Sequence, residues 1–312
     1  PLALSAHQLV TRLQELFTYK VQYFRAKNRR SERDLYHYVS TVYRLCRILG
    51  WIRAAQREQS TLGVSDRTFS QKIIKAIREV QSALADGRVT PGSRLKSLAK
   101  RWELELPEME QDQVKQLEDS IDDLLWQSLG NRPRKDLLSF SKDEQVDILR
   151  KVAALLCEAI DEKLVLDDVL TSHRSTAYRA LARTEAWIYR DWQQAIGDVM
   201  LRESNMESST RKLTVIGYLE FEQLYLEHQS NENEHLWLER IEQLFYNLNL
   251  HLGNADEIDA RVGQLRTLSK TLVDLVQVLE EADSGSDLFT EDEREEMKTF
   301  MEAIATEGET NP

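Results

Sequence analysis

Four polar side chains in otherwise apolar helical stretches are the residues of this sequence best suited to binding a small ligand. Arg44 and Trp51 are seven residues apart, and Arg190 and Gln194 are four apart, so each pair shares one face of a helix. Guanidinium, indole and amide groups inside an apolar bundle need hydrogen-bond partners. The four side chains therefore either line a pocket for an anion or another small ligand, or form a buried network that fixes the helix register. We favour the network.

A basic segment near the N-terminus carries the strongest functional signal. Its cations are interleaved with Tyr19, Tyr23, Phe24 and Tyr36, a mixture that suits phosphate contact with base stacking over residues 19–57. The same mixture suits an anionic membrane surface, an acidic helix of the same protein, or a basic face that only contacts water. The basic side chains are Lys20, Arg25, Lys27, Arg29, Arg30 and Arg33.

Motifs for catalysis or metal binding are missing from the sequence. It contains no GxSxG, Walker A, GxGxxG or HExxH pattern. The nearest approach to a metal cluster is His228, Glu234, His235 and Glu239, which we interpret as a polar loop that enters a helix. We predict no catalytic residue, no metal and no cofactor, and we favour a non-catalytic function over an enzymatic one.

The composition is that of a highly charged helical protein. Of 312 residues, 41% are hydrophobic and 30% charged, with only 11 Gly and 5 Pro, which favours helix nearly throughout. No apolar run reaches the length of about 18 residues that a membrane span needs. Cys46 and Cys157 lie in apolar runs without a CxxC motif, so we expect buried, reduced thiols and a cytoplasmic protein.

The charge is divided unevenly along the chain. Residues 1–101 hold 20 Lys/Arg and 7 Asp/Glu, a net of +13, whereas residues 102–312 hold 21 and 46, a net of −25. This asymmetry indicates an anionic partner near the N-terminal part, or attraction between the two parts of the same fold.

Long amphipathic helices must position these residues. A helix predicted over 31–62 carries Arg44 and Trp51, and one predicted over 175–203 carries Arg190 and Gln194. The following stretch, 213–228, is predicted to be helical despite its β-branched residues, because no partner strand is evident. The first of these helices has apolar residues in alternating steps of three and four, namely Leu35, Tyr38, Val42, Leu45, Leu49 and Ile52.

We therefore predict an all-α, multi-helix antiparallel bundle with an acidic insertion and a tail helix. The basic N-terminal helices of the core occupy 5–87, the acidic insertion 88–172, the C-terminal core helices 173–283, and a linker with the tail helix 284–312. Capping boxes at Ser141/Glu144 and Thr290/Glu293 mark two helix starts. The tail helix either folds back on the core or binds a groove in a partner.

Three groups of residues resemble a family of bacterial all-helical proteins. The first is Ser40-Thr-Val-Tyr43-Arg44-Leu with Gly50-Trp51. The second is Tyr189-Arg190-Asp-Trp-Gln193-Gln194-Ala195-Ile196-Gly197 with Met200. The third is Thr214-Val-Ile-Gly217-Tyr218 with Leu265-Arg-Thr-Leu268 and Leu272-Val-Asp274-Leu-Val-Gln-Val-Leu279. The resemblance covers about half of the chain and implies a helical fold, but no particular activity. Members of that family often carry an N-terminal membrane helix followed by basic residues, whereas this sequence has the basic residues without that helix. A position close to a membrane in the full-length form is what this resemblance implies.

These observations lead to three functional hypotheses. The first is a non-catalytic cytoplasmic interaction or scaffold protein that binds a protein partner or a second copy of itself. The second is a nucleic-acid-binding protein that uses residues 19–57. The third is an enzyme of unfamiliar type that uses a pocket between the helices of Arg44 and Arg190.

Overall fold

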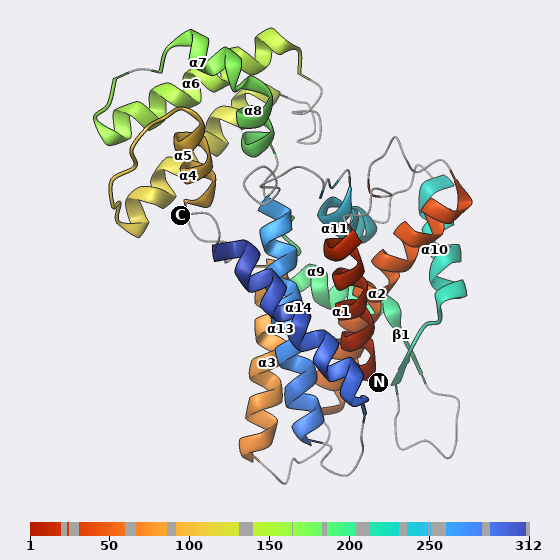
Figure 1. Cartoon of the computed structure of the whole chain (residues 1–312). Coiled ribbons are helices and arrows are strands. Elements are labelled where there is room, and N and C mark those ends of the chain that lie inside the picture. The colour runs from red at the N-terminus through yellow and green to blue at the C-terminus, as the bar shows by residue number, and fades with distance from the viewer. Residues whose placement is uncertain are drawn as a thin grey trace. The chain divides into compact units, whose positions relative to one another are not determined.

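A computed structural model describes residues 1–19, 24, 31–59, 67–85, 92–130, 140–163, 165–182, 186–203, 213–230, 236–246, 248, 250, 260–282 and 288–309. The described chain is all-α apart from one two-stranded ribbon, which confirms the predicted fold class (Figure 1). None of its described helices is long and apolar enough to cross a membrane. Two compact units are present: unit 1 comprises Pro1–Gly87, Ala186–His251 and Gln264–Pro312, and unit 2 comprises Arg88–Glu185 and Leu252–Gly263.

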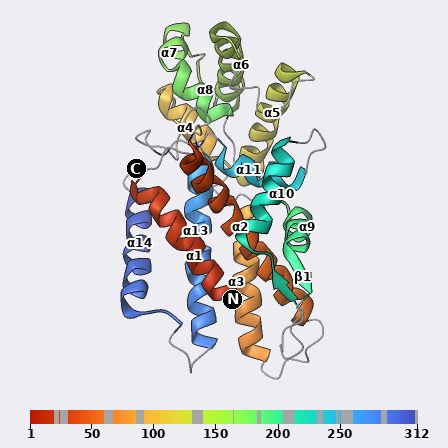
Figure 2. The same ribbon diagram turned by 90° about the vertical axis from the view of Figure 1, so that its right-hand side faces the viewer.

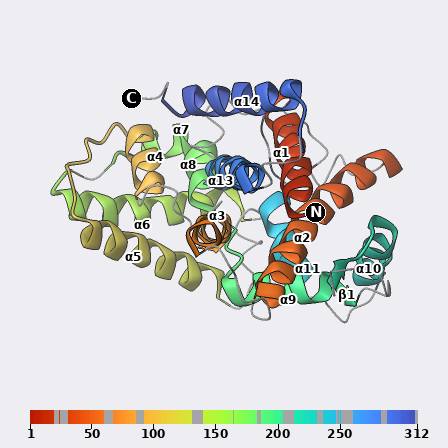
Figure 3. The same ribbon diagram turned by 90° about the horizontal axis from the view of Figure 1, so that it is seen from below.

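Unit 1 is organised around α2, the long helix that the apolar spacing predicts. Five of the six predicted apolar positions on α2 are buried, and only Leu35 is partly exposed, at 38%. In unit 1, α2 packs against α1 and against α9 (Figure 3). The helices of this unit are α1 (Leu2–Tyr19), α2 (Glu32–Gln59), α3 (Arg67–Ala85), α9 (Arg190–Met200), α10 (Tyr218–Ser230), α11 (Leu236–Phe245), α13 (Ala260–Ala282) and α14 (Glu291–Glu309). The part of α13 that belongs to unit 1 begins at Gln264.

Glycine allows α2 and α9 to approach closely. A Cβ added at Gly197 would lie 2.6 Å from the Cβ of Arg53 and 2.9 Å from the carbonyl oxygen of Leu49. A Cβ added at Gly50 would lie 2.9 Å from the Cβ of Met200. Since real Cβ atoms do not approach this closely, both glycines are required by the packing of the two helices.

The predicted helix over 175–203 is wrong, because the chain is extended at residues 186–189 and α9 begins only at Arg190. Tertiary hydrogen bonds replace helical ones in this segment. Ile188 N–H donates to the carbonyl oxygen of Leu84 at 2.8 Å, and Ala186 N–H donates to Oε1 of Gln264 at 2.9 Å. The Gln264 amide Nε2 donates back to the carbonyl oxygen of Ala186 at 3.0 Å.

The prediction of helix from residue 213 is also wrong. Leu213–Val215 forms strand β2, which pairs antiparallel with β1, Leu201–Glu203. Strand β1 follows α9 directly. Its three residues fall in what the sequence pattern predicts to be the last turn of the helix over 175–203. The β-branched Thr214 and Val215 thus adopt the extended conformation that such residues favour.

The tail helix α14 folds back onto its own chain (Figure 2). Its apolar side chains Met297, Phe300 and Ile304 are buried. The rings of Phe17 in α1 and Phe300 in α14 lie 6.3 Å apart. Arg294 also pairs with Glu280 of α13 at 2.6 Å. The predicted Thr290/Glu293 capping box is present at the start of α14, with Glu293 N–H donating to Thr290 Oγ1.

Unit 2 has its own apolar core. Its centre includes Trp102, Ile121 and Leu156. The unit extends beyond the predicted insertion 88–172, because Tyr178 and Leu181 belong to the same core. The helices are α4 (Ser93–Arg101), α5 (Gln111–Leu129), α6 (Lys142–Ile160), α7 (Asp167–Ser172) and α8 (Arg174–Ala182), and the predicted Ser141/Glu144 capping box begins α6.

Candidate functional site

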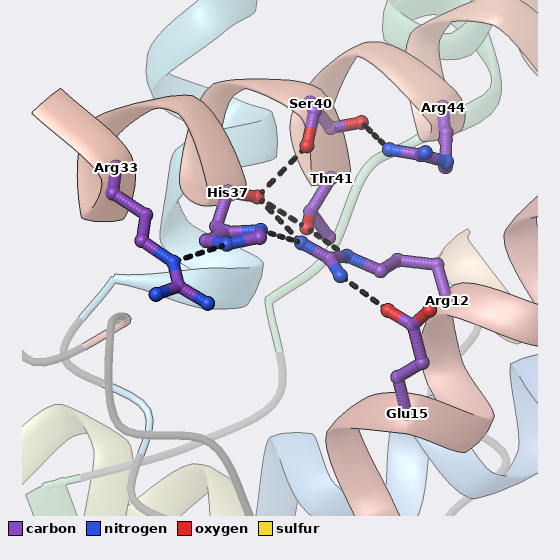
Figure 4. Close-up of polar contacts among 7 residues, drawn as sticks. All are labelled: Arg12, Glu15, Arg33, His37, Ser40, Thr41 and Arg44. Atoms are coloured by element: carbon purple, nitrogen blue, oxygen red, sulfur yellow. Dashed lines mark hydrogen bonds and ion pairs between the residues drawn. The ribbon is translucent and has the colours of Figure 1, made fainter.

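Polar side chains of α1 and α2 meet in a group that we call the Arg12–His37 network (Figure 4). Residues at intervals of three and four on α2 lie on neighbouring turns of one face, and two of them, His37 and Thr41, contact Arg12 of α1. Arg12 reaches them because it lies on the buried face of α1, together with Leu9, Leu13 and Leu16. The members of the network are Arg12, Glu15, Arg33, His37, Ser40, Thr41 and Arg44.

Arg12 is the centre of this network, and only 8% of it is exposed. Its Nε donates to Thr41 Oγ1 at 2.9 Å, its Nη2 donates to the carbonyl oxygen of His37 at 3.1 Å, and its Nη1 pairs with the carboxylate of Glu15. A buried guanidinium is stable only when acceptors surround it. These bonds therefore fix the position of α1 against α2.

The carbonyl oxygen of His37 is shared by three side chains. Besides Arg12, it accepts a hydrogen bond from Thr41 Oγ1 at 2.7 Å and one from Ser40 Oγ at 3.1 Å. This part of the network is therefore structural, since its donors serve the backbone of α2.

The imidazole of His37 lies between two arginines. Its Nδ1 is 3.1 Å from Arg12 Nη2, and its Nε2 is 3.5 Å from Arg33 Nε. The pKa of His37 is lowered from its ordinary value, chiefly by burial and then by the positive charges of Arg12 and Arg33, while Glu15 and Asp34 act weakly in the opposite direction. His37 is therefore a neutral ring at pH 7.

An aromatic group continues from the network toward α10. The Tyr36 ring lies 5.5 Å from the His37 ring and 5.7 Å from the Tyr218 ring, and Tyr43 lies 5.5 Å from Tyr218. The hydroxyl of Tyr43 donates to the carbonyl oxygen of Ile216 at 3.0 Å. Burial raises the pKa of Tyr43, and burial with a hydrogen bond to Glu222 raises that of Tyr218. Both phenols are therefore protonated near pH 7.

The four predicted pocket residues have different surroundings. Arg44 donates to the carbonyl oxygen of Ser40 in its own helix at 2.9 Å, whereas Arg190 donates to Ser82 Oγ of α3 at 2.9 Å. The indole nitrogen of Trp51 is buried and has no hydrogen-bond partner among the described residues. Gln194 is exposed.

The buried glutamine of α9 is Gln193, the neighbour of the predicted residue. Its Nε2 donates to the carbonyl oxygens of Gln81 at 2.9 Å and Ile188 at 2.7 Å. Within α9, Gln193 therefore lies on the buried face and Gln194 on the exposed face.

Most of the predicted basic surface lies outside the described residues. This applies to Lys20, Arg25, Lys27, Arg29 and Arg30. Arg33 is described, and it is an exposed residue of α2 whose guanidinium faces His37 (Figure 4).

Neither the carboxylates nor the cysteines of the described chain form a metal site. No group of three or more His, Cys, Asp or Glu residues within the described ranges is arranged to hold a metal ion. Cys46 and Cys157 are buried free thiols, and burial raises the pKa of both. Neither thiol is in its reactive thiolate form at neutral pH.

Sequence reasoning missed Arg12 and His37. The available signal for Arg12 was a charged residue at helical spacing within an apolar stripe, three residues from both Leu9 and Glu15. His37 offered only its spacing of four from Arg33 and Thr41.

Comparison with models of protein families, with curated proteins and with solved structures gives no match to this chain. The resemblance to a bacterial helical family therefore stays a prediction.

Proposed function

We propose that this chain is a non-catalytic interaction protein that binds another protein through α2 and α10. The observation that carries the proposal is the exposure of large apolar side chains on these two helices of unit 1. Leu219 is 74% exposed, Leu226 is 50% exposed and Tyr36 is 50% exposed. Exposed apolar groups that lie together mark interaction sites more often than they mark ordinary surface.

The arrangement of these side chains supports the proposal. Leu219 and Leu226 are seven residues apart on α10, two helical turns, so they project from the same face. Tyr36 lies next to the start of that helix, because its ring contacts that of Tyr218 at 5.7 Å. Arg33 is one turn before Tyr36 on α2. Tyrosine and arginine are the residue types that dominate the binding energy of protein interfaces.

The polar groups beneath this surface support a binding function over catalysis. Ser40, Thr41 and Arg12 all bond to the carbonyl oxygen of one residue, His37. Hydroxyls engaged in this way stabilise a helix instead of activating a nucleophile. The Arg12–His37 network thus provides a rigid base for the surface that Tyr36 and α10 present.

The test is a surface variant with a matched control. Leu219→Asp places a charge in the proposed interface, and Leu166→Asp does the same at a leucine of unit 2 that is 71% exposed. We expect the wild-type protein and Leu166→Asp to form a complex of defined stoichiometry, either with a second copy in sedimentation velocity or with one protein cross-linked in native extract. Leu219→Asp should lose it. A complex that survives Leu219→Asp, or a wild-type chain that forms none, would refute the proposal.

The other two functional hypotheses stay predictions. Nucleic-acid binding through residues 19–57 depends mainly on side chains outside the described residues. It is tested by a low-salt mobility assay on DNA and RNA, with Arg25, Lys27, Arg29 and Arg30 replaced by Ala. An enzyme that uses Arg44 and Arg190 would need both arginines at one cavity.

A further inference from the structure

The extended segment 186–189 is hydrogen-bonded along one of its two edges. In an extended chain the N–H and C=O groups of successive residues point to opposite sides. Both groups of Ala186 bond to the side-chain amide of Gln264. Ile188 N–H donates to the carbonyl oxygen of Leu84 at 2.8 Å, and its own carbonyl oxygen accepts from a glutamine of α9 at 2.7 Å. This inner edge is therefore paired at alternate residues, like a strand inside a sheet.

The groups on the outer edge, which we call the Trp187 edge, are N–H and C=O of Trp187 and N–H of Tyr189. None of them is hydrogen-bonded to any residue that the structure describes. Backbone groups without a partner are rarely buried, because losing water without gaining a hydrogen bond is costly. The Trp187 edge therefore contacts solvent, and it presents one acceptor between two donors.

Side chains alternate along the segment as its hydrogen bonds do. Ala186 and Ile188 are buried, at 6% and 0% exposure, whereas Tyr189 is 60% exposed and Trp187 is partly exposed. The rings of Trp187 and Tyr189 are stacked, with 6.5 Å between their centroids and 29° between their planes. Two aromatic side chains thus lie on one face of the segment beside the unpaired backbone groups. A strand added at this edge would gain side-chain contacts as well as hydrogen bonds.

We propose that the Trp187 edge binds an extended peptide of a partner protein as an antiparallel strand, with β-branched apolar side chains at alternate positions of the peptide. One peptide residue exchanges both of its backbone hydrogen bonds with Trp187, and the residue two before it accepts from Tyr189 N–H. The side chains at these two peptide positions lie on the face of the aromatic rings, where β-branched residues pack well.

The size and rigidity of the Trp187 edge suit a peptide. A stable complex of two folded chains buries about 800 Å² on each partner, far more than this short segment offers. The segment is already fixed from its inner side by Gln264, which is 1% exposed, so that binding orders little of the chain. The edge shares no residue with the surface of α2 and α10, and this inference therefore goes beyond the proposed function.

The test is a titration of the full chain, labelled with nitrogen-15, with the peptide acetyl-Ser-Val-Thr-Val-Thr-Val-Ser-amide. Amide spectra monitor Trp187 and Tyr189 directly, and replacement of each by Phe assigns its signal. In the free protein we expect the Trp187 amide to exchange rapidly with water and the Ile188 amide slowly. The peptide should shift both edge signals saturably. A Trp187 amide as protected as that of Ile188, or no saturable shift, would overturn the proposal.

Methylation of the peptide nitrogens tests the pairing itself. Methyl groups on the three valines remove the N–H groups that face the Trp187 edge, whereas methyl groups on the two threonines remove those that face away. The valine-methylated peptide should bind about fivefold more weakly or worse, the value of one net hydrogen bond. The threonine-methylated peptide should keep its affinity. Equal losses in the two peptides would exclude an antiparallel strand at this edge.

Three protein variants locate the binding site. Trp187→Ala should weaken peptide binding by about fivefold or more, since it removes one of the two rings. Trp126→Ala removes a tryptophan of unit 2 that is 51% exposed and should leave binding unchanged. Equal weakening by both would reveal adhesion to exposed aromatic rings and overturn the proposal. Leu219→Asp should also leave peptide binding unchanged, so that the proposed function and this site are tested separately.

Discussion

The side chain of Gln264 provides the most direct test of how unit 1 is held together. Its Oε1 accepts from Ala186 N–H at 2.9 Å, and its Nε2 donates to the carbonyl oxygens of Ala186 at 3.0 Å and Ala83 at 3.3 Å. The residue is 1% exposed, so water cannot replace these bonds without opening the structure. Replacement of Gln264 by methionine keeps the volume of the side chain and removes every one of them.

The expected cost follows from the groups left behind. Ala186 N–H and the Ala186 carbonyl oxygen would stay buried without the bonds that Gln264 provides, at about 1–3 kcal/mol for each unsatisfied group. Partial relaxation of the extended segment brings the expected loss to about 2–4 kcal/mol. The loss concerns unit 1, which contains all three segments involved.

Amide hydrogen exchange of residues 186–200 measures this loss locally, which matters because a chain with two units need not unfold in one step. Exchange should accelerate by about 30- to 900-fold, the equivalent of about 2–4 kcal/mol. Gln194→Met is the matched control, since Gln194 is an exposed glutamine of α9. Equal exchange rates in Gln264→Met and Gln194→Met would refute the reasoning.

Two further predictions concern packing and pH. Gly197→Ala should destabilise unit 1 by about 1–3 kcal/mol, because the added Cβ would lie 2.6 Å from the Cβ of Arg53. Gly217→Ala, whose Cβ would meet nothing within 4 Å, is the control, and equal urea midpoints would contradict the prediction. The lowered pKa of His37 means that the unfolded chain takes up a proton below about pH 6.5 that the folded ring does not. Stability should therefore decrease as the pH falls from about 6.5 toward the folded pKa, with no contribution from His37 above that window; an unchanged acid-side slope in His37→Gln would argue against this.

The sequence correctly predicted those features of the fold that depend on residues close together in the chain. The apolar steps of three and four along α2 correspond to side chains that are buried from Tyr38 to Ile52. The capping boxes of α6 and α14 were also predicted correctly, since a cap involves residues only three apart.

Bonds between distant residues decided the features that were mispredicted. The break before α9 depends on Gln264, which is 78 residues from its partner Ala186. Strand β2 depends on β1, whose sequence continues a helical pattern without interruption. Likewise, Arg12 joins the candidate site through Thr41, 29 residues away. Periodicity within one window contains no information on such partners.

The two units also differ in when their contacts become available during synthesis. The described core of unit 2 lies between Leu95 and Leu181 in one continuous segment, so it can collapse as soon as that segment leaves the ribosome. Unit 1 instead needs Leu84, Ile188 and Gln264 together, and its last helix begins only at Glu291. The faces of α1 and α2 that pack against α14 and α9 are therefore made first and buried last. During translation they form the longest-lived exposed surface of the chain, the one that a chaperone would encounter.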